Sequence, residues 1–462
     1  MHELLRENCH GHRPHSPTGS PSPTNLPNPQ TCRRYRPAGH RTPARRQSRW
    51  PTLRGHRVPT TRRRPPPRRQ GTAGRSSGAE KRGYDGSSRL CPHCQKTAQF
   101  QRHQAKNVVS ALGQVRLRRA YYYCRHCRKG HCPWDQTLRL TLTDFTPAAE
   151  ELISLAGSLA SFADAADKVL PRLAGIRLAE STAERMTEGS GQRLARRRAA
   201  GETFGVERDW PWPKDAQGRT CVYVSVDATG VGMQGPGATA AEGRMAYVGL
   251  IYCPGEKGEP TRERALAGLY ALPDLGMQMR RQGAQVGMDR AEVWVALTDG
   301  GAGLEEFMGV HFPRAACVLD FYHAAEHLND LAKALYPGEE GKAAEVAGAW
   351  CHTLKHEGGV ALLAVLEGLE MRGRKASVRE VYRREVGYVR GNVHRMDYPR
   401  YVADGWLIGS GHVEAACKAV VGQRLKGNGM RWGEAGADAV CHLGALFKSE
   451  KGQWEAFWGN AA

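Results

Sequence analysis

The sequence predicts a mixed α/β protein, in which a sheet-based module follows a cysteine-rich segment and a helical one. Three observations lead to this fold class. Apolar stretches rich in β-branched and aromatic residues come first between residues 221 and 298, and strands then alternate with helices. Two CxxC pairs precede them, and apolar residues at helical spacing fill the segment between. A chain of 462 residues is long enough for several such modules.

The N-terminal segment, residues 1–88, differs in composition from the rest. Residues 1–90 carry 20 Lys and Arg against 4 Asp and Glu, a local +16 out of the chain's net +21. Rich in Pro, Ser and Arg, the segment cannot bury enough apolar surface to offset the entropy of ordering it. We expect a disordered tail. Three interpretations remain open. The tail is a solvated extension, a stretch that results from a start codon assigned upstream of the true one, or a basic arm with salt-sensitive affinity for nucleic acid.

The sequence indicates neither a membrane span nor a signal peptide. No apolar run approaches the roughly 18 to 20 residues needed to cross a bilayer, and no compact apolar core precedes a small-residue cleavage site. Lone cysteines in apolar surroundings, such as Cys221, Cys253 and Cys317, are typical of free thiols in a reducing compartment. We therefore expect an intracellular protein without membrane contact or disulfides.

Residues 89–145 are predicted to form a zinc ribbon. Two CxxC turns supply four thiolates, which make a closed, structural Zn²⁺ site, and "VRLRRAYYY" between them suits hairpin strands. The predicted ligands are Cys91, Cys94, Cys124 and Cys127. His131 and Cys132 follow closely and are rival ligands. Arginines of the same module are candidates for contacting DNA phosphates, namely Arg116, Arg118, Arg119, Arg125 and Arg128.

Residues 146–205 are predicted to be helical. Their apolar residues recur at helical spacing, and "LAGIRLAESTAERM" places a glycine turn before another helix. This pattern fits a helix-turn-helix that binds DNA, and it fits ordinary helix packing equally well.

Carboxylates at strand ends are the strongest chemical signal in the rest of the chain. "CVYVSVDATGV" is a strand that ends at Asp227, and "AEVWVALTDGG" is a strand that ends at Asp299; "GRMAYVGLIYCPG" and "RERALAGLYALPD" are strand candidates between them. Glu414 lies on the first turns of a helix opened by a Gly-Ser-Gly turn. Crowded carboxylates resist joint ionisation unless a divalent cation neutralises them. We therefore expect these three acids to hold Mg²⁺ (or Mn²⁺) for phosphodiester chemistry.

"RAACVLDFYHAAEHL" reads as a strand that runs into a helix capped by Asp320. Because it also ends an apolar run, Asp320 is a rival to Asp299 as the second metal ligand. We favour a supporting role for Asp320 and His323. Basic residues that follow Glu414 are candidates for binding phosphates: Lys418, Arg424, Lys426 and Arg431.

The stretch "HAAEH" (residues 323–327) matches the HxxEH zinc helix of one class of metallopeptidase. His323 and His327 share one helix face, with Glu326 as the base. No later residue stands out as a third ligand, and this interpretation leaves the cysteine pairs and the three acids unexplained. A peptidase therefore remains a remote alternative.

Four stretches, "VSVDATG", "ALTDGG", "VLDFYHAAEHL" and "GSGHVEAACKAVVGQRLKGNGMRW", together resemble the DDE transposases of bacterial insertion sequences. The nearest likeness is to the Kra-type branch of the Mutator-like superfamily, and it covers roughly residues 90 to 450. It implies a ribonuclease H-like catalytic domain at 218–330 and 406–450, interrupted by a helical insertion at 331–405. It also implies a metal-binding triad of Asp227, Asp299 and Glu414, with Asp320 and His323 as an acid-x-x-His pair.

The same resemblance implies Mg²⁺-dependent DNA strand cleavage and transfer at the ends of an insertion sequence. The zinc and helical modules would bind the terminal inverted repeats, and a homodimer or larger assembly would form the synaptic complex with target DNA, in the bacterial cytoplasm at the nucleoid. The alternative is a DNA-binding protein that derives from a transposase and is no longer catalytic. Trp350 and Trp406 would either stack on an unpaired base or pack in the core.

Overall fold

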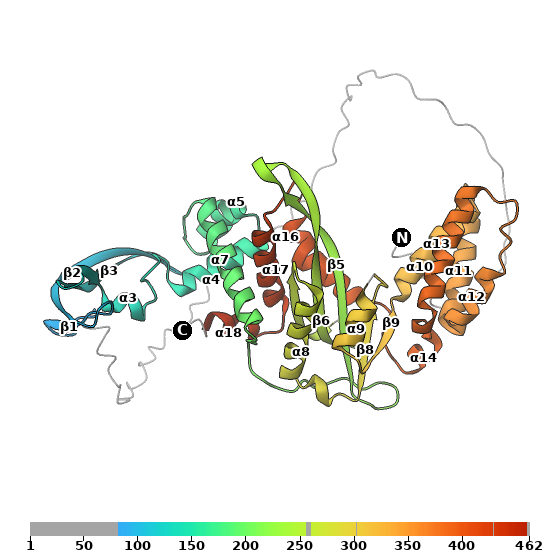
Figure 1. The fold of residues 1–462 in the computed structure, drawn as a ribbon, viewed down its shortest axis with the longest axis horizontal. Coiled ribbons are helices and arrows are strands. Elements are labelled where there is room, and N and C mark those ends of the chain that lie inside the picture. Colours follow the sequence, from blue (N-terminus) through green and yellow to red (C-terminus); the bar gives the residue numbers. More distant parts are fainter. Residues whose placement is uncertain (1–81, 256–259, 302, 428, 460–462) are drawn as a thin grey trace, which may run out of the picture. The chain divides into compact units, whose positions relative to one another are not determined.

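The computed structural model describes residues 82–459 apart from 256–259, 302 and 428. The prediction of a disordered tail at 1–88 therefore lies outside the described residues up to position 81. The described chain is mixed α/β, as the sequence predicts, and contains a four-stranded and a five-stranded sheet (Figure 1). No described helix has both the length and the apolar character required to cross a bilayer.

The four-stranded sheet is antiparallel throughout, in the order β1-β2-β3-β4. Its strands are β1 (Ser88–Leu90), β2 (Thr97–Ser110), β3 (Gly113–Cys124) and β4 (Lys129–His131). The two long strands form a hairpin whose turn ends at Gly113, in the left-handed region at φ +97°. A small apolar core of Ala98, Ala120 and Tyr122 packs with cysteines at one end of the hairpin, and α3 (Pro133–Thr137) follows.

Helices occupy the next segment, as predicted. They are α4 (Pro147–Leu159), α5 (Phe162–Asp164), the π-helical turn η1 (Ala165–Val169), α6 (Leu170–Leu173) and α7 (Glu180–Ala199). Thr146 caps α4 by accepting a hydrogen bond from the Ala149 amide. The long helix α7 packs closely against α17 (Glu434–Lys448) of the following module, because Gly191 has no side chain to separate the two backbones.

The five-stranded sheet has the order β7-β6-β5-β8-β9. β5, β6 and β7 pair antiparallel, whereas β8 and β9 run parallel to β5. The strands are β5 (Cys221–Gln234), β6 (Ala240–Pro254), β7 (Pro260–Gly268), β8 (Val293–Thr298) and β9 (Ala315–Leu319). Between the strands and after them lie α8 (Leu272–Gln285), η3 (Met288–Arg290), α9 (Leu304–His311) and α10 (Phe321–Leu335).

Both faces of this sheet are buried. Val222 and Val224 of β5 join one apolar core with Leu275 of α8 and Phe307 of α9. Tyr223, between them in the sequence, points to the opposite face, whose core includes residues of α10 and of the C-terminal helices. The C-terminal helices are α15 (Gly411–Ala416), the π-helical turn η5 (Cys417–Gly422), α16 (Gln423–Leu425), α17 and α18 (Gln453–Gly459). The continuous apolar run of β5 reflects this double burial.

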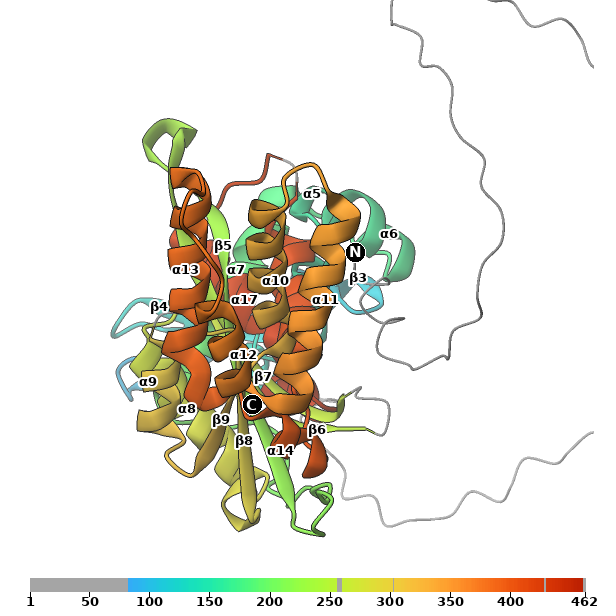
Figure 2. The same ribbon diagram turned by 90° about the vertical axis from the view of Figure 1, so that its right-hand side faces the viewer.

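A helical group separates α10 from α15. It consists of α11 (Glu340–Glu357), α12 (Gly359–Glu367), α13 (Ala376–Asn392), η4 (Val393–Arg395) and α14 (Tyr398–Ala403). Figure 2 shows α10, α11 and α13 as neighbouring helices, and α10 contacts both of the others. The helices from α11 to α14 lie within the predicted insertion at 331–405, whereas α10 begins before residue 331 and ends inside the insertion.

One predicted strand is partly wrong. "RERALAGLYALPD" forms strand only as far as Gly268, and its last residues begin helix α8. Pro273 in the first turn of α8 favours a helix start. Leu275 and Met279, four residues apart, give the helix its buried face. The short apolar run at 265–272 does not by itself distinguish a strand from a strand followed by a helix.

Candidate functional site

Two CxxC turns bring four cysteine sulfurs together, as predicted. Each turn joins a short strand to a long one, and the residue after each pair, Gln95 or Arg128, has a left-handed backbone with φ of 60° or 57°. The sulfurs of the four cysteines lie within 4.8 Å of one another. They belong to Cys91, Cys94, Cys124 and Cys127. His131 and Cys132, the rival ligands, are not in this group.

The spacing of the sulfurs fits a tetrahedral zinc ion. The Cys91–Cys127 and Cys94–Cys124 sulfur distances are both 3.6 Å. A zinc ion with Zn–S bonds of ~2.3 Å requires sulfurs roughly 3.8 Å apart. A hydrogen bond from the backbone amide of Cys127 is the main cause that lowers the pKa of the Cys124 thiol to about 7, which favours its thiolate form. Burial raises the pKa of the Cys127 thiol, so the fit to a metal ion rests on the positions of the sulfurs. The cluster can therefore hold a metal ion, and its geometry suits structural zinc.

The arginines of the hairpin divide into exposed and buried side chains. Arg116, Arg118, Arg125 and Arg128 are exposed. Arg119 is only 5% exposed and forms an ion pair with Asp135. The prediction that Arg119 contacts DNA is therefore wrong for this structure, because its charge is used inside the protein.

The three predicted catalytic acids come from separate elements of the five-stranded sheet module. Asp227 lies in the middle of β5, so the prediction that this strand ends at Asp227 is wrong, because pairing with β6 continues to Gln234. Asp299 directly follows β8, as predicted, and Glu414 lies on α15. The parallel pairing of β5 with β8 aligns Ser225 with Leu297, so Asp227 and Asp299 each stand two residues beyond the last aligned pair. α15 contacts β5 and β6. Glu414 is thereby carried to the same part of the sheet.

The negative charges of the other two acids act on Asp227. Burial is the main cause that raises the pKa of Asp227, and the negative charges of Asp299 and Glu414 raise it further. A hydrogen bond with the Cys417 thiol acts in the opposite direction. The acids are less tightly grouped than the cysteines. Within the described part of the chain, the cysteine cluster is the one group of three or more metal-ligand side chains whose donor atoms all lie within 4.8 Å.

The donor set suits a hard cation. All three side chains offer carboxylate oxygens, which are the ligands that Mg²⁺ prefers, and all three are partly exposed. The Gly301 amide donates to Oδ1 of Asp299 (2.8 Å), and the Ala228 amide donates to Oδ1 of Asp227 (2.6 Å). In both cases a backbone amide one or two residues after the aspartate holds its carboxylate in place.

Asp320 has a different environment from Asp299. It is 1% exposed, and its Oδ1 accepts hydrogen bonds from the amides of Tyr322 (2.6 Å) and His323 (3.2 Å), so it caps α10 as predicted. Its Oδ2 accepts from the Ser410 amide (2.8 Å) and the Ser410 hydroxyl. Both oxygens of Asp320 are thus used within the protein. Asp320 therefore ties the start of α15 to the end of β9, whereas the Asp299 side chain is partly exposed.

The basic residues after Glu414 also differ in accessibility. Lys418, Lys426 and Arg431 are exposed, Lys418 lies 3.5 Å from Glu414, and Lys426 contacts the Thr229 hydroxyl on β5. These lysines lie beside the acids and are available to phosphates.

Arg424, by contrast, is buried. Its guanidinium lies between the rings of Phe162 and Trp432 and donates to the carbonyl of Gly157 (2.7 Å). Burial lowers the pKa of Arg424 to about 10. The prediction that Arg424 binds DNA is therefore wrong for this structure, and the residue instead links α16 to the helical segment.

The histidines of "HAAEH" are engaged with protein groups. His327 Nδ1 lies 2.5 Å from Glu385 on α13, and its ring stacks on Tyr388. His323 lies 3.6 Å from Glu326. No set of three metal-ligand atoms that includes this stretch is found among the described residues.

Both tryptophans of the insertion region pack within the protein. Trp350 is 5% exposed and belongs to the core, and Trp406 stacks on Tyr401 with their rings 12° from parallel. Core packing, the second of the two predicted roles, describes Trp350, whereas Trp406 is partly buried and packs against the core.

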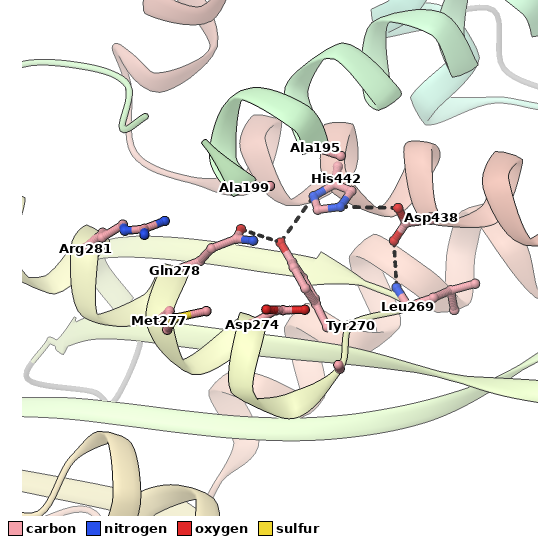
Figure 3. Close-up of a pocket in the computed structure, with 11 residues that line it drawn as sticks. Ala195, Ala199, Leu269, Tyr270, Asp274, Met277, Gln278, Arg281, Asp438 and His442 are labelled. Carbon is pink, nitrogen blue, oxygen red and sulfur yellow. Dashed lines mark hydrogen bonds and ion pairs between the residues drawn. The ribbon is translucent and has the colours of Figure 1, made fainter. Parts of the chain in front are cut away.

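A cavity of about 280 Å³ lies elsewhere, between α7, α8, α17 and the end of β7 (Figure 3). Its polar centre is Tyr270, whose hydroxyl donates to Gln278 (2.9 Å) and lies 3.3 Å from His442 Nδ1. His442 in turn faces Asp438 at 3.5 Å. None of the three predicted acids lines this cavity.

Sequence reasoning did not identify several residues that contact the acids. Cys417 bonds Asp227, Ser410 bonds Asp320, and Tyr388 donates to the backbone carbonyl of Asp299 (3.0 Å). Ser410 and Cys417 lie in the stretch around Glu414, so their proximity was a usable signal. Tyr388 lies 89 residues beyond Asp299, in a helix with no chemical motif.

Comparison with known proteins adds no assignment. Neither a scan against models of known protein families nor a search of curated proteins found a match.

Replacing Cys124 with Ser should reduce the zinc content of the purified protein from about one ion per chain to almost none, since a structural site needs all four thiolates. Zinc is measured by mass spectrometry of the purified protein. Cys132→Ser is the matched control, because this neighbouring thiol lies outside the cluster. Zinc loss with Cys132→Ser and retention with Cys124→Ser would contradict the ligand assignment.

Asp227→Asn should raise the melting temperature at pH 7.5 in the absence of divalent ions. The raised pKa of Asp227 means that the folded state disfavours its ionised form, so the charge destabilises the fold above this pKa. The gain should shrink as the pH falls, because the wild-type carboxyl becomes protonated in both folded and unfolded states. Melting curves of both proteins at pH 7.5 and pH 4 check this. A variant that is less stable at pH 7.5 would contradict the electrostatic account.

Proposed function

We propose that this protein is a transposase of the DDE type, which cleaves and transfers DNA strands at the ends of an insertion sequence. The observation that carries the proposal is the convergence of Asp227, Asp299 and Glu414 from β5, β8 and α15. Partly exposed carboxylates grouped in one place, one of them with a raised pKa, are typical of divalent-cation sites in phosphodiester chemistry.

The arrangement of the five-stranded sheet supports a ribonuclease H-like catalytic domain. Three antiparallel strands are followed by two parallel ones, and a helical group separates the second acid from the third. The sequence motifs that resemble the Kra-type branch of Mutator-like transposases coincide with the middle of β5, the ends of β8 and β9, and α15. We infer the same branch for this protein.

In the proposed reaction, divalent Mg²⁺ would activate water or a 3′-hydroxyl and stabilise the leaving oxygen. Asp227, Asp299 and Glu414 would hold the ions. Lys418 and Lys426, exposed beside these acids, would bind the phosphates that flank the reacting position. Asp320 would keep α15, and with it Glu414, in place through Ser410.

The cysteine module is proposed as a zinc ribbon that binds the element ends. Its exposed arginines project from a hairpin held at one end by the cysteine cluster, and such side chains give salt-dependent, sequence-independent affinity for the DNA backbone. The segment from α4 to α7 is a second candidate for contacting the terminal repeats. Synapsis of two ends would require at least a homodimer.

Replacing Asp227 or Asp299 with Asn, or Glu414 with Gln, should reduce Mg²⁺-dependent cleavage of the element's own ends by ~10³-fold or more, since each removes a charge needed to hold the cation. Cuts are mapped at nucleotide resolution on labelled DNA. Binding of DNA without Mg²⁺, measured by anisotropy, should persist.

Glu326→Gln is the matched control, and it should leave cleavage unchanged because Glu326 is exposed, forms its ion pair with His323 and is not one of the three acids. Complete loss with Asp320→Asn but normal activity with Asp299→Asn would reassign the second ligand. Folded wild-type protein that binds the ends without cutting them would favour the non-catalytic DNA-binding alternative. Peptide hydrolysis that depends on Glu326 would favour the peptidase.

Replacing Arg116 and Arg118 together with Gln should weaken binding to the element ends and to unrelated DNA alike. The plot of log affinity against log salt concentration should become less steep by about 2, one for each lost phosphate contact. Anisotropy titrations at several salt concentrations measure this slope. Arg379→Gln with Arg383→Gln, two exposed arginines on α13, is the control with an equal charge change. Equal slopes for both double variants would contradict a specific role of the hairpin.

A further inference from the structure

The helical insertion contacts the end of β8 through two side chains. Tyr388 on α13 donates a hydrogen bond from its phenol oxygen to the backbone carbonyl of Asp299 (3.0 Å). Arg395 on η4 donates to the hydroxyl of Thr298 (3.1 Å), in a buried position. Tyr388 and Arg395, which lie 89 and 97 residues further along the chain than their partners, thus hold the last residue of β8 and the residue after it.

We propose that Tyr388 is a positioning residue for Asp299, an inference that rests on the proposed function. Asp299 is followed by Gly300 and Gly301, so its backbone lies in a stretch with unusual conformational freedom. Gly300 adopts φ +81°, which few other residues tolerate. The bond from Tyr388 fixes the Asp299 peptide just before this turn, and with it the direction of the carboxylate.

The contact between Tyr388 and the turn is close. A Cβ atom at Gly300 would lie only 2.9 Å from the Tyr388 hydroxyl and 2.9 Å from Cδ1 of Leu319 on β9. The phenol therefore lies directly against the turn.

The ring of Tyr388 is itself held in place by the "HAAEH" helix. His327 stacks on it with ring centroids 3.7 Å apart and planes 19° from parallel. His327 Nδ1 lies 2.5 Å from Glu385, which is 1% exposed. Arg384 bonds the other oxygen of Glu385 (2.6 Å). The second histidine of the motif thus supports Tyr388 from α10.

The test compares Tyr388→Phe with Tyr382→Phe. Tyr382 lies on the same helix and also donates its hydroxyl to a backbone carbonyl, that of Leu366 (3.1 Å), within the insertion. Each variant removes one hydroxyl and keeps the ring, so both should fold. Only the Tyr388 variant removes a bond to the Asp299 peptide.

The first readout is hydrogen exchange of the peptide that contains Asp299 to Leu304, in protein without divalent ions or DNA. The Gly301 amide, which donates to the Asp299 carboxylate, reports on the turn. Exchange there should rise about fivefold in Tyr388→Phe, the factor that corresponds to one hydrogen bond, and stay unchanged in Tyr382→Phe.

The second readout is the Mg²⁺ concentration that gives half-maximal strand cleavage. It should rise about fivefold in Tyr388→Phe with unchanged DNA affinity, because a less ordered Asp299 binds the cation more weakly. If Tyr388→Phe matches Tyr382→Phe in both readouts while the wild type cleaves, the positioning role is refuted. If the wild type does not cleave but exchange rises only in Tyr388→Phe, the anchor stands and the transposase proposal fails.

Discussion

The structure of the candidate site depends on the cost of holding three carboxylates near one another in a partly buried place. Burial raises the pKa of Asp227, and the negative charges of Asp299 and Glu414 raise it further. The protein meets this cost with rigid elements. Parallel pairing of β5 with β8 puts Asp227 and Asp299 at the same height along the two neighbouring strands. Helix α15, which packs on the sheet, carries Glu414. An arrangement of like charges that is fixed before a cation binds is suited to electrostatic catalysis.

Asp320 bonds backbone groups on both sides of the large insertion, so the three acids can stay grouped although the insertion separates the second from the third. Its carboxylate caps α10 and also bonds Ser410, 90 residues away. The chain leaves the sheet along α10 and returns to it at α15. The buried side chain of Asp320 links these two points. Because an unpaired buried carboxylate would be costly, this junction forms only when both partners are in place. The residue that caps α10 thus also bonds the start of α15, the helix that carries the third acid.

The sequence predicts much of this fold, and the exceptions have physical causes. Apolar strands, the cysteine cluster and the Asp320 cap follow from local patterns. Helix α8 was missed because a short apolar run does not specify its own secondary structure. Arg119 and Arg424 were expected to face DNA. Instead, Arg119 pairs with Asp135, and Arg424 lies between the rings of Phe162 and Trp432. Residue type gives the charge of a side chain, whereas its partner depends on tertiary packing.

The "HAAEH" stretch shows why spacing alone does not define a metal site. Two histidines four apart share a helix face, but a common ion also requires nitrogen lone pairs that converge on one point. The rings of His323 and His327 are 88° from parallel, and His327 is directed to Glu385. Its stacking on Tyr388 joins α10 to α13, and Tyr388 joins α13 to the end of β8. The insertion is therefore mechanically connected to the predicted metal ligands, so a change in its helices would reach Asp299 through side-chain contacts.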